Sequence, residues 1–141
     1  MAACTEFFIA AVADAETLRR AGGGPAFPSI ELQGIGLVDV LHLGSLLTKT
    51  TCLPETVLEA TASTPVSVTK VCRELLDALP LLSAAPKRAA IAADWKKGTP
   101  HFSAVPVEVL DEVLLELAGL AALARREGKE LLELHAVASR G

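Results

Sequence analysis

The pattern of hydrophobic and polar positions in the N-terminal part of the chain predicts a strand, a short helix and a second strand. Residues 6–12 (EFFIAAV) are apolar without alternation, which is typical of a strand covered on both faces. Asp14 is suited to cap a helix over residues 15–21. The glycines and proline of residues 22–25 end that helix, and residues 29–34 (SIELQG) alternate as a half-buried strand does.

A second helix is predicted over residues 37–47, where apolar side chains cover most of the circumference. A helix that is hydrophobic nearly all round is normally buried. We therefore expect it to be the central helix of the fold. Its only polar residues are Asp39, His42 and Ser45.

Two segments rich in Val and Thr, residues 55–61 and 66–71, predict a β-hairpin across residues 63–65 (STP). The first arm (ETVLEAT) could equally form a helix beginning at Pro54, because Glu, Leu and Ala favour helices. The pattern leaves both alternatives open.

Two helical pieces follow, over residues 72–79 and 85–97, with Pro80 interrupting the helical pattern between them. Trp95 is expected to anchor the second piece on the core, with its indole N–H directed to a partner at the surface. Gly98 ends that piece. The whole region is therefore expected to be helical.

The clearest periodicity predicts a long helix over residues 106–127, where Leu, Val and Ala recur at three- and four-residue steps. Residues 130–137 (ELLELHAV) then form a final strand, in the same sheet as residues 6–12. The fold class is therefore α+β, or mixed α/β, in a single globular domain over residues 1–141. Helices are expected to pack on a small mixed sheet.

Composition excludes several classes of protein. The chain has 141 residues, of which 51% are hydrophobic and 21% charged, a balance that excludes a disordered protein. Its net charge of −4 repels phosphate backbones and anionic lipids, so nucleic acid is not expected as a partner. There is no run of about 20 apolar residues that could span a membrane.

The three cysteines, Cys4, Cys52 and Cys72, lie in separate segments and form no CxxC motif. Their odd number argues against the disulfide framework of a secreted protein. We therefore expect unpaired, non-catalytic cysteines and a cytoplasmic protein.

Asp39, His42 and Ser45 include the residue types of an acid–base–nucleophile set, at steps of three along one helix. Side chains six residues apart on a helix cannot converge on one substrate atom, so we predict no catalytic residue among them. Residues 34–36 (GIG) have the setting of a dinucleotide loop, but Asp39 takes the third glycine position and would repel a pyrophosphate. No cofactor is predicted.

Glu133 and His135 share one face of the last predicted strand. Two candidate ligands without a completing Cys, His or carboxylate motif are too few for a metal site, because structural zinc needs four ligands. We interpret both as polar residues at an edge or facing solvent, and predict no metal.

Binding residues tend to lie on loops, and residues 99–105 form the longest irregular stretch of the C-terminal half. His101 and Phe102 are therefore the candidate binding surface for a protein partner. The alternative is a small-molecule-binding domain or an enzyme, with a pocket near Asp39, His42 and His101 and with Ser45 beside it.

Three segments carry a resemblance to a known group of proteins: IELQGIGLVDVLHLGSLLT, VCRELLDAL and EVLLELAGLAALARREGKELLEL. With them the chain resembles small uncharacterised bacterial proteins of the YfbM type. The resemblance implies an α/β protein that binds another protein, as immunity proteins bind the toxins they inhibit. It transfers no functional residue, and neither the partner nor the oligomeric state follows from the sequence.

Overall fold

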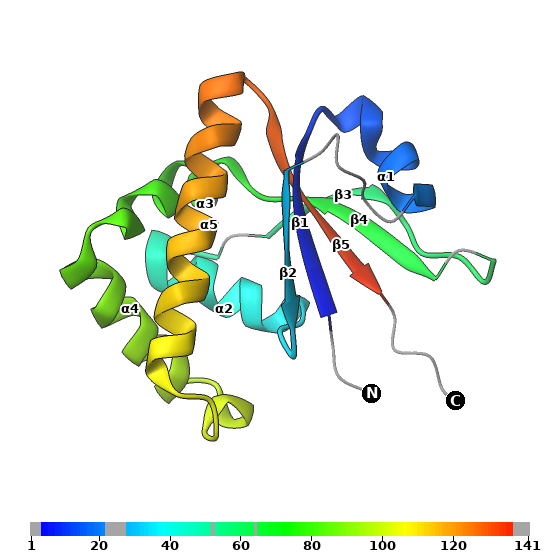
Figure 1. Ribbon diagram of the computed structural model, residues 1–141. Helices are drawn as coiled ribbons and strands as arrows, with labels where there is room; N and C mark the ends of the chain where they lie inside the picture. The colour runs from blue at the N-terminus through cyan, green and yellow to red at the C-terminus, as the bar shows by residue number, and fades with distance from the viewer. Residues whose placement is uncertain (1–3, 22–27, 52, 64, 137–141) are drawn as a thin grey trace.

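The structure is a computed structural model that describes residues 4–21, 28–51, 53–63 and 65–136 (Figure 1). The expected turn at residues 22–25, Cys52, and the last residue of the predicted final strand, Val137, lie outside the described residues, as do the side chains of Cys4 and Ala136.

In the described residues the sheet has five strands in the order β2-β1-β5-β4-β3. Every pairing is antiparallel, so the sheet is not the expected mixed one. The strands are β1 (Cys4–Ala10), β2 (Ser29–Gln33), β3 (Glu55–Leu58), β4 (Val66–Lys70) and β5 (Glu130–Ala136). The final strand lies between β1 and β4, so the prediction that the first and last strands share one sheet is confirmed.

The helices lie on both faces of the sheet. They are α1 (Ala15–Ala21), α2 (Leu37–Thr48), α3 (Arg73–Ala78), α4 (Ala85–Lys97) and α5 (Val107–Glu127). Figure 1 shows α1 beside the β3–β4 hairpin, and α2 to α5 gathered on the other side. Helix α5 contacts the sheet directly, and α4 packs on α5. The α+β class with a long C-terminal helix and a final strand is therefore confirmed.

The core has two layers because successive side chains of a strand point to opposite faces. Phe7 and Ile9 of β1 belong to the layer between the sheet and α5, whereas Phe8 belongs to the layer beneath α1. Covering on both faces explains why residues 7–10 show no alternation, whereas Ala11 and Val12, which the pattern places in the strand, lie beyond its end and are exposed.

Helix α2 does not take the central position that its composition predicts. Its buried side consists of Asp39, Val40, Leu43 and Gly44, and Val38 is 75% exposed. Helix α5 takes that position, with seven buried residues. An all-round apolar pattern therefore marks here a helix with an exposed apolar face, which is unusual unless that face has a function.

The hairpin alternative is the right one for residues 55–61. Strand β3 pairs with β4 with Glu55 opposite Lys70, and their charged ends lie 3.2 Å apart. Val and Thr suit this half-buried surface better than a helix. After α3 the chain passes into a short 3-10 helix that contains Pro80, η2 (Leu79–Ser83). Two further 3-10 helices in the described residues are η1 (Val12–Asp14) and η3 (Pro100–Phe102).

One cysteine corrects the redox expectation. Cys72 is disulfide-bonded, so the prediction of unpaired cysteines is wrong. Its sulfur also accepts a hydrogen bond from the N–H of Leu75 at 3.4 Å and caps α3. Disulfides persist mainly in oxidising compartments, so the cysteines no longer support a cytoplasmic location.

None of the described helices is both long and apolar enough to cross a lipid bilayer.

Two carboxylates face each other across β1 and β2, since Glu6 pairs with Glu31. Burial raises the pKa of Glu6 above its ordinary value of 4.5, and the charge of Glu31 raises it further. A raised folded-state pKa contributes stability below the unfolded value, and that contribution is lost as pH rises through the folded pKa. Keeping Glu6 ionised therefore costs stability at neutral pH.

We expect Glu6→Gln to raise the urea midpoint at about pH 7 and to leave it almost unchanged at about pH 4, because the wild-type carboxyl is protonated there. Urea denaturation at both pH values measures the difference. Glu116→Gln, at an exposed position of α5, is the control. Equal shifts at both pH values would contradict the effect.

Candidate functional site

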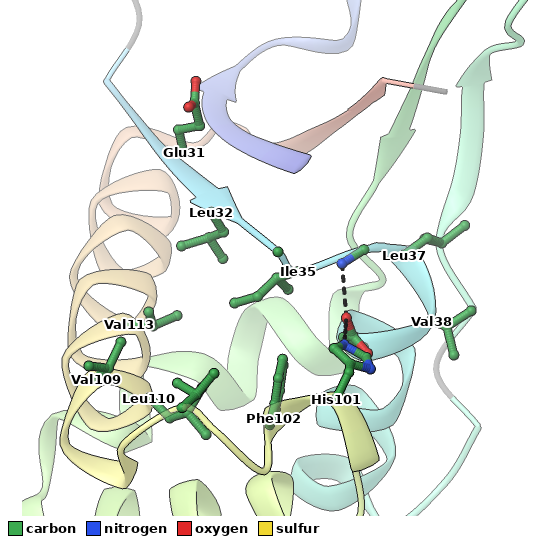
Figure 2. Close-up of a pocket in the computed structure, with 14 residues that line it drawn as sticks. Glu31, Leu32, Ile35, Leu37, Val38, His101, Phe102, Val109, Leu110 and Val113 are labelled. Carbon is green, nitrogen blue, oxygen red and sulfur yellow. Dashed lines mark hydrogen bonds and ion pairs between the residues drawn. The ribbon is translucent and has the colours of Figure 1, made fainter. Parts of the chain in front are cut away.

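A pocket of about 860 Å³ opens between the edge strand β2, the first turn of α2, the short helix η3 and the N-terminal half of α5 (Figure 2). Its wall is mainly apolar, and its polar side chains are Glu31, Asp39 and His101. The apolar lining consists of Leu32, Ile35, Leu37, Val38, Phe102, Val105, Val109, Leu110 and Val113.

Asp39 and His101 form a pair in this pocket. His101 Nε2 lies 2.9 Å from Asp39 Oδ2, and the same oxygen accepts the backbone N–H of Gly36 at 3.0 Å. The Asp39 side chain is 8% exposed, whereas that of His101 is 57% exposed. An ionised carboxylate can only accept, so Nε2 carries a proton and Nδ1 is left as the second ring nitrogen. Nδ1 has no hydrogen-bond partner among the described residues.

The turn before α2 places Asp39 in this position. Gly34 has φ +78°, a left-handed conformation that glycine adopts without strain, and Gly36 is the N-cap of the helix. Asp39 reaches back from the third helical position to the N-cap N–H, where the helix dipole favours negative charge. The carboxylate thus accepts the N–H that an anionic ligand could otherwise use at this helix N-terminus.

Helix α4 contacts the segment that follows His101. Lys96 Nζ donates to the carbonyls of Phe102 and Ser103, at 3.3 and 3.2 Å, and to that of Val105. Phe102 also packs edge-on against the Trp95 ring, with centroids 5.2 Å apart. These contacts fix the irregular stretch as a folded part of the pocket wall.

Phe102 is therefore not the exposed contact residue that the loop predicts, because it is buried against Trp95. His101, the other candidate, remains on the surface with its ring 4.8 Å from that of Phe102. The correction follows from the anchoring of the loop by α4, which the sequence does not reveal.

Trp95 connects the same region to α2. Its indole N–H donates to the backbone carbonyl of Asp39 at 3.0 Å, across 56 positions of sequence. The predicted core anchor is thus confirmed, but the partner of its N–H is the buried residue Asp39, which holds His101, and not a group at the surface.

The other two members of the Asp39, His42 and Ser45 set lie outside the pocket lining. His42 Nδ1 is 3.2 Å from Thr99 Oγ1, and the ring lies so close to Gly98 that a Cβ there would overlap it. Ser45 is exposed on the far side. Asp39, His42 and Ser45 do not converge, as the helical spacing predicts, and the pair is formed with His101 instead.

Glu133 and His135 are buried in the central strand β5, so their interpretation as edge or solvent-facing residues is wrong. They contact Thr5 and Thr69 of the neighbouring strands, which the sequence analysis did not single out. In the part of the chain that the structure describes, no three His, Cys, Asp or Glu side chains are grouped so that they could hold a metal ion.

The pocket can accommodate an apolar body and a polar group. Its polar lining side chains are two carboxylates and an imidazole, and the lining includes no Ser, Thr, Cys or Lys. The imidazole of His101 offers a hydrogen-bond acceptor that a buried carboxylate holds in place.

No protein-family model matches the chain, and no curated protein or solved structure is significantly similar to it. The resemblance to YfbM-type proteins stays a prediction.

Proposed function

We propose that the protein binds a small amphipathic molecule in this pocket. One observation carries the proposal: Asp39 and His101, which are 62 positions apart, meet at an apolar cavity of about 860 Å³. Pockets for small molecules are typically about 300 to 1,000 Å³ and combine apolar walls with a few placed polar groups. The apolar part of the ligand lies against Ile35 and Leu110.

The polar pair selects the chemistry of the ligand. When His101 is neutral and carries its proton on Nε2 toward Asp39, Nδ1 is an acceptor and takes a hydroxyl or N–H group. The carboxylates of Asp39 and Glu31 lie in the same lining and repel an anion. We therefore propose a neutral ligand with a hydrogen-bond donor, rather than a fatty acid or a phosphate.

Octanol and octanoate are suitable probes, because they differ in the group that meets His101. Methyl and amide NMR shifts during titration measure the binding of each. We expect saturable binding of octanol at the pocket residues and weaker binding of octanoate. The absence of saturable shifts with both probes, or equal binding of the two, would contradict the proposal in its stated form.

Two residues of α5 give a matched pair of variants. Val109 lines the pocket and is 45% exposed, while Leu115 lies outside the lining and is 46% exposed. Val109→Trp is expected to fill the mouth of the pocket and to weaken octanol binding about 10-fold or more, by the loss of apolar contact worth more than 1.4 kcal/mol. Leu115→Trp should leave binding unchanged. Equal effects would place the probe elsewhere.

A protein partner is the second candidate, and a specific observation favours it. Leu37 and Val38 of α2 and Val109 of α5 are exposed apolar side chains that line the same pocket. Clustered exposed apolar residues commonly mark an interaction site. The net charge of −4 suits a basic partner, as in an immunity-type inhibitor of a toxin. For this candidate we expect a bacterial protein of the cytoplasm. The disulfide bond of Cys72 is more typical of an oxidising compartment and argues against that location.

Variants at the rim separate the two candidates. Val38→Asp should abolish capture of a protein partner from the source cell, because a charge replaces an exposed apolar contact. Val38 also lines the pocket, so octanol binding is measured on the same variant. Leu81→Asp, at an exposed site outside the pocket lining, is the control for charge. If Val38→Asp lost octanol binding and the wild-type protein captured no partner, the results would favour the small-molecule candidate over the protein partner.

A further inference from the structure

A row of hydrogen bonds leads from the central strand β5 to the pocket. His135 of β5 lies between two threonines, with Nδ1 3.3 Å from Thr5 Oγ1 and Nε2 3.4 Å from Thr69 Oγ1. Thr5 continues the row to the backbone of Ile35 at 2.7 Å. Ile35 lines the pocket, so the buried histidine is connected to its wall.

The position of one proton follows from the partners of Thr5. A carbonyl oxygen can only accept, so the Thr5 hydroxyl donates its single proton to Ile35. Its oxygen must then accept the bond from His135, and Nδ1 of His135 is the donor. The direction of donation therefore runs from β5 toward the pocket.

The peptide group between Ile35 and Gly36 carries the row across the pocket wall. Its carbonyl accepts from Thr5, and its N–H donates to Asp39 Oδ2 at 3.0 Å. Hydrogen bonds in such a chain polarise one another, so accepting at the carbonyl strengthens donation by the N–H. The same carboxylate oxygen then holds His101 at 2.9 Å.

The far end of the row is compatible with this direction. Glu133 Oε2 is 2.9 Å from Thr69 Oγ1 and 3.9 Å from His135 Nε2. A proton shared among these groups can reside on Nε2 or on the carboxyl. In both arrangements Nδ1 keeps its proton, because Thr5 requires it.

We infer that Thr5 and His135 are positioning residues of the pocket: they hold the peptide between Ile35 and Gly36 so that its N–H fixes the Asp39 carboxylate and, through it, the ring of His101. The inference rests on the unliganded geometry alone. It therefore stands or fails independently of which molecule the pocket binds.

Thr5→Val tests the inference, because valine keeps the shape of threonine and lacks its hydroxyl. The hydrogen bonds of Thr5 to Ile35 and to His135 are then both lost. We expect the Gly36 amide to exchange with solvent about 3- to 10-fold faster, which corresponds to the net value of one hydrogen bond. The ring ¹⁵N shifts of His101 should move from those of a ring protonated on Nε2 toward those of a mixture of tautomers. Both are measured by NMR on the unliganded protein.

Two variants serve as controls. Thr69→Val makes the same substitution on the other side of His135 and should leave Gly36 exchange and the His101 shifts unchanged, because the step through Thr5 is intact. Thr5→Ser restores a hydroxyl and should restore both readouts. Equal changes in Thr5→Val and Thr69→Val would indicate general loosening and overturn the inference.

The wild-type protein supplies a test that needs no variant. Nδ1 of His135 should show the ¹⁵N shift of a protonated ring nitrogen wherever the protein is folded. Deprotonated Nδ1 in the folded protein would overturn the direction of the row, even if Thr5→Val did not fold.

Discussion

Trp95→Ala is expected to lower the free energy of unfolding by about 3 to 5 kcal/mol, the cost of removing a large buried aromatic side chain. The Trp95 side chain is 0% exposed and lies where α4, α2 and η3 meet. Its removal leaves a cavity beneath Phe102 and takes a donor from the carbonyl of Asp39. The variant should therefore lose stability and disturb the pocket together.

Urea denaturation followed by circular dichroism measures this loss. Trp95→Phe is the matched variant, because it keeps an aromatic ring for the edge-on contact with Phe102 and removes only the indole N–H and part of the volume. Its loss should be clearly smaller than that of Trp95→Ala. A loss below about 1 kcal/mol in Trp95→Ala would show that this junction does not stabilise the fold as its burial indicates.

Local patterns predict the elements of this fold well and their positions less well. The long period of residues 106–127 is visible in the sequence because one face of α5 packs on the sheet. The sequence does not distinguish a strand from a helix over residues 55–61, because Glu, Leu and Ala there favour a helix. The pairing with β4 makes residues 55–58 a strand. For α2, a composition that predicts burial does not show that Val38 faces outward at the pocket.

The sequence identifies Asp39 and His101 as separate candidates, but it does not predict that they form a pair. The spacing of Asp39, His42 and Ser45 excludes a triad, but it gives no reason to prefer Asp39 over His42. That preference comes from the turn at Gly36 and from η3, which bring His101 to the carboxylate. Phe102 is held in place by Trp95 and Lys96, which lie in the preceding helix α4. The spacing of apolar residues in the sequence does not reveal these contacts.

The buried row of Thr5, Thr69, Glu133 and His135 escaped the sequence analysis for a topological reason. From the sequence alone, Glu133 and His135 are interpreted as edge or solvent-facing polar residues, which need no further explanation. Because β5 lies between β1 and β4, the same two side chains are buried and must find partners on the neighbouring strands. Polar residues within an apolar run, as in LELH, were the available signal.

Leu117→Ala is expected to cost about 2 to 5 kcal/mol of unfolding free energy, because a buried leucine leaves both lost apolar contact and a cavity. Leu117 is 1% exposed and belongs to the core layer between α5 and the sheet. Alanine keeps the helix propensity of this position at least as high, so the loss reports on packing rather than on helix formation.

Leu115→Ala provides the comparison within the same helix, since Leu115 is 46% exposed and only two positions away. The same atoms are removed from a surface position, where changes are usually within about 0.5 kcal/mol. Urea denaturation of both variants under identical conditions measures the difference. If Leu117→Ala also lost less than about 0.5 kcal/mol, that side chain would not be part of the core, and the packing of α5 on the sheet would have to be rejected.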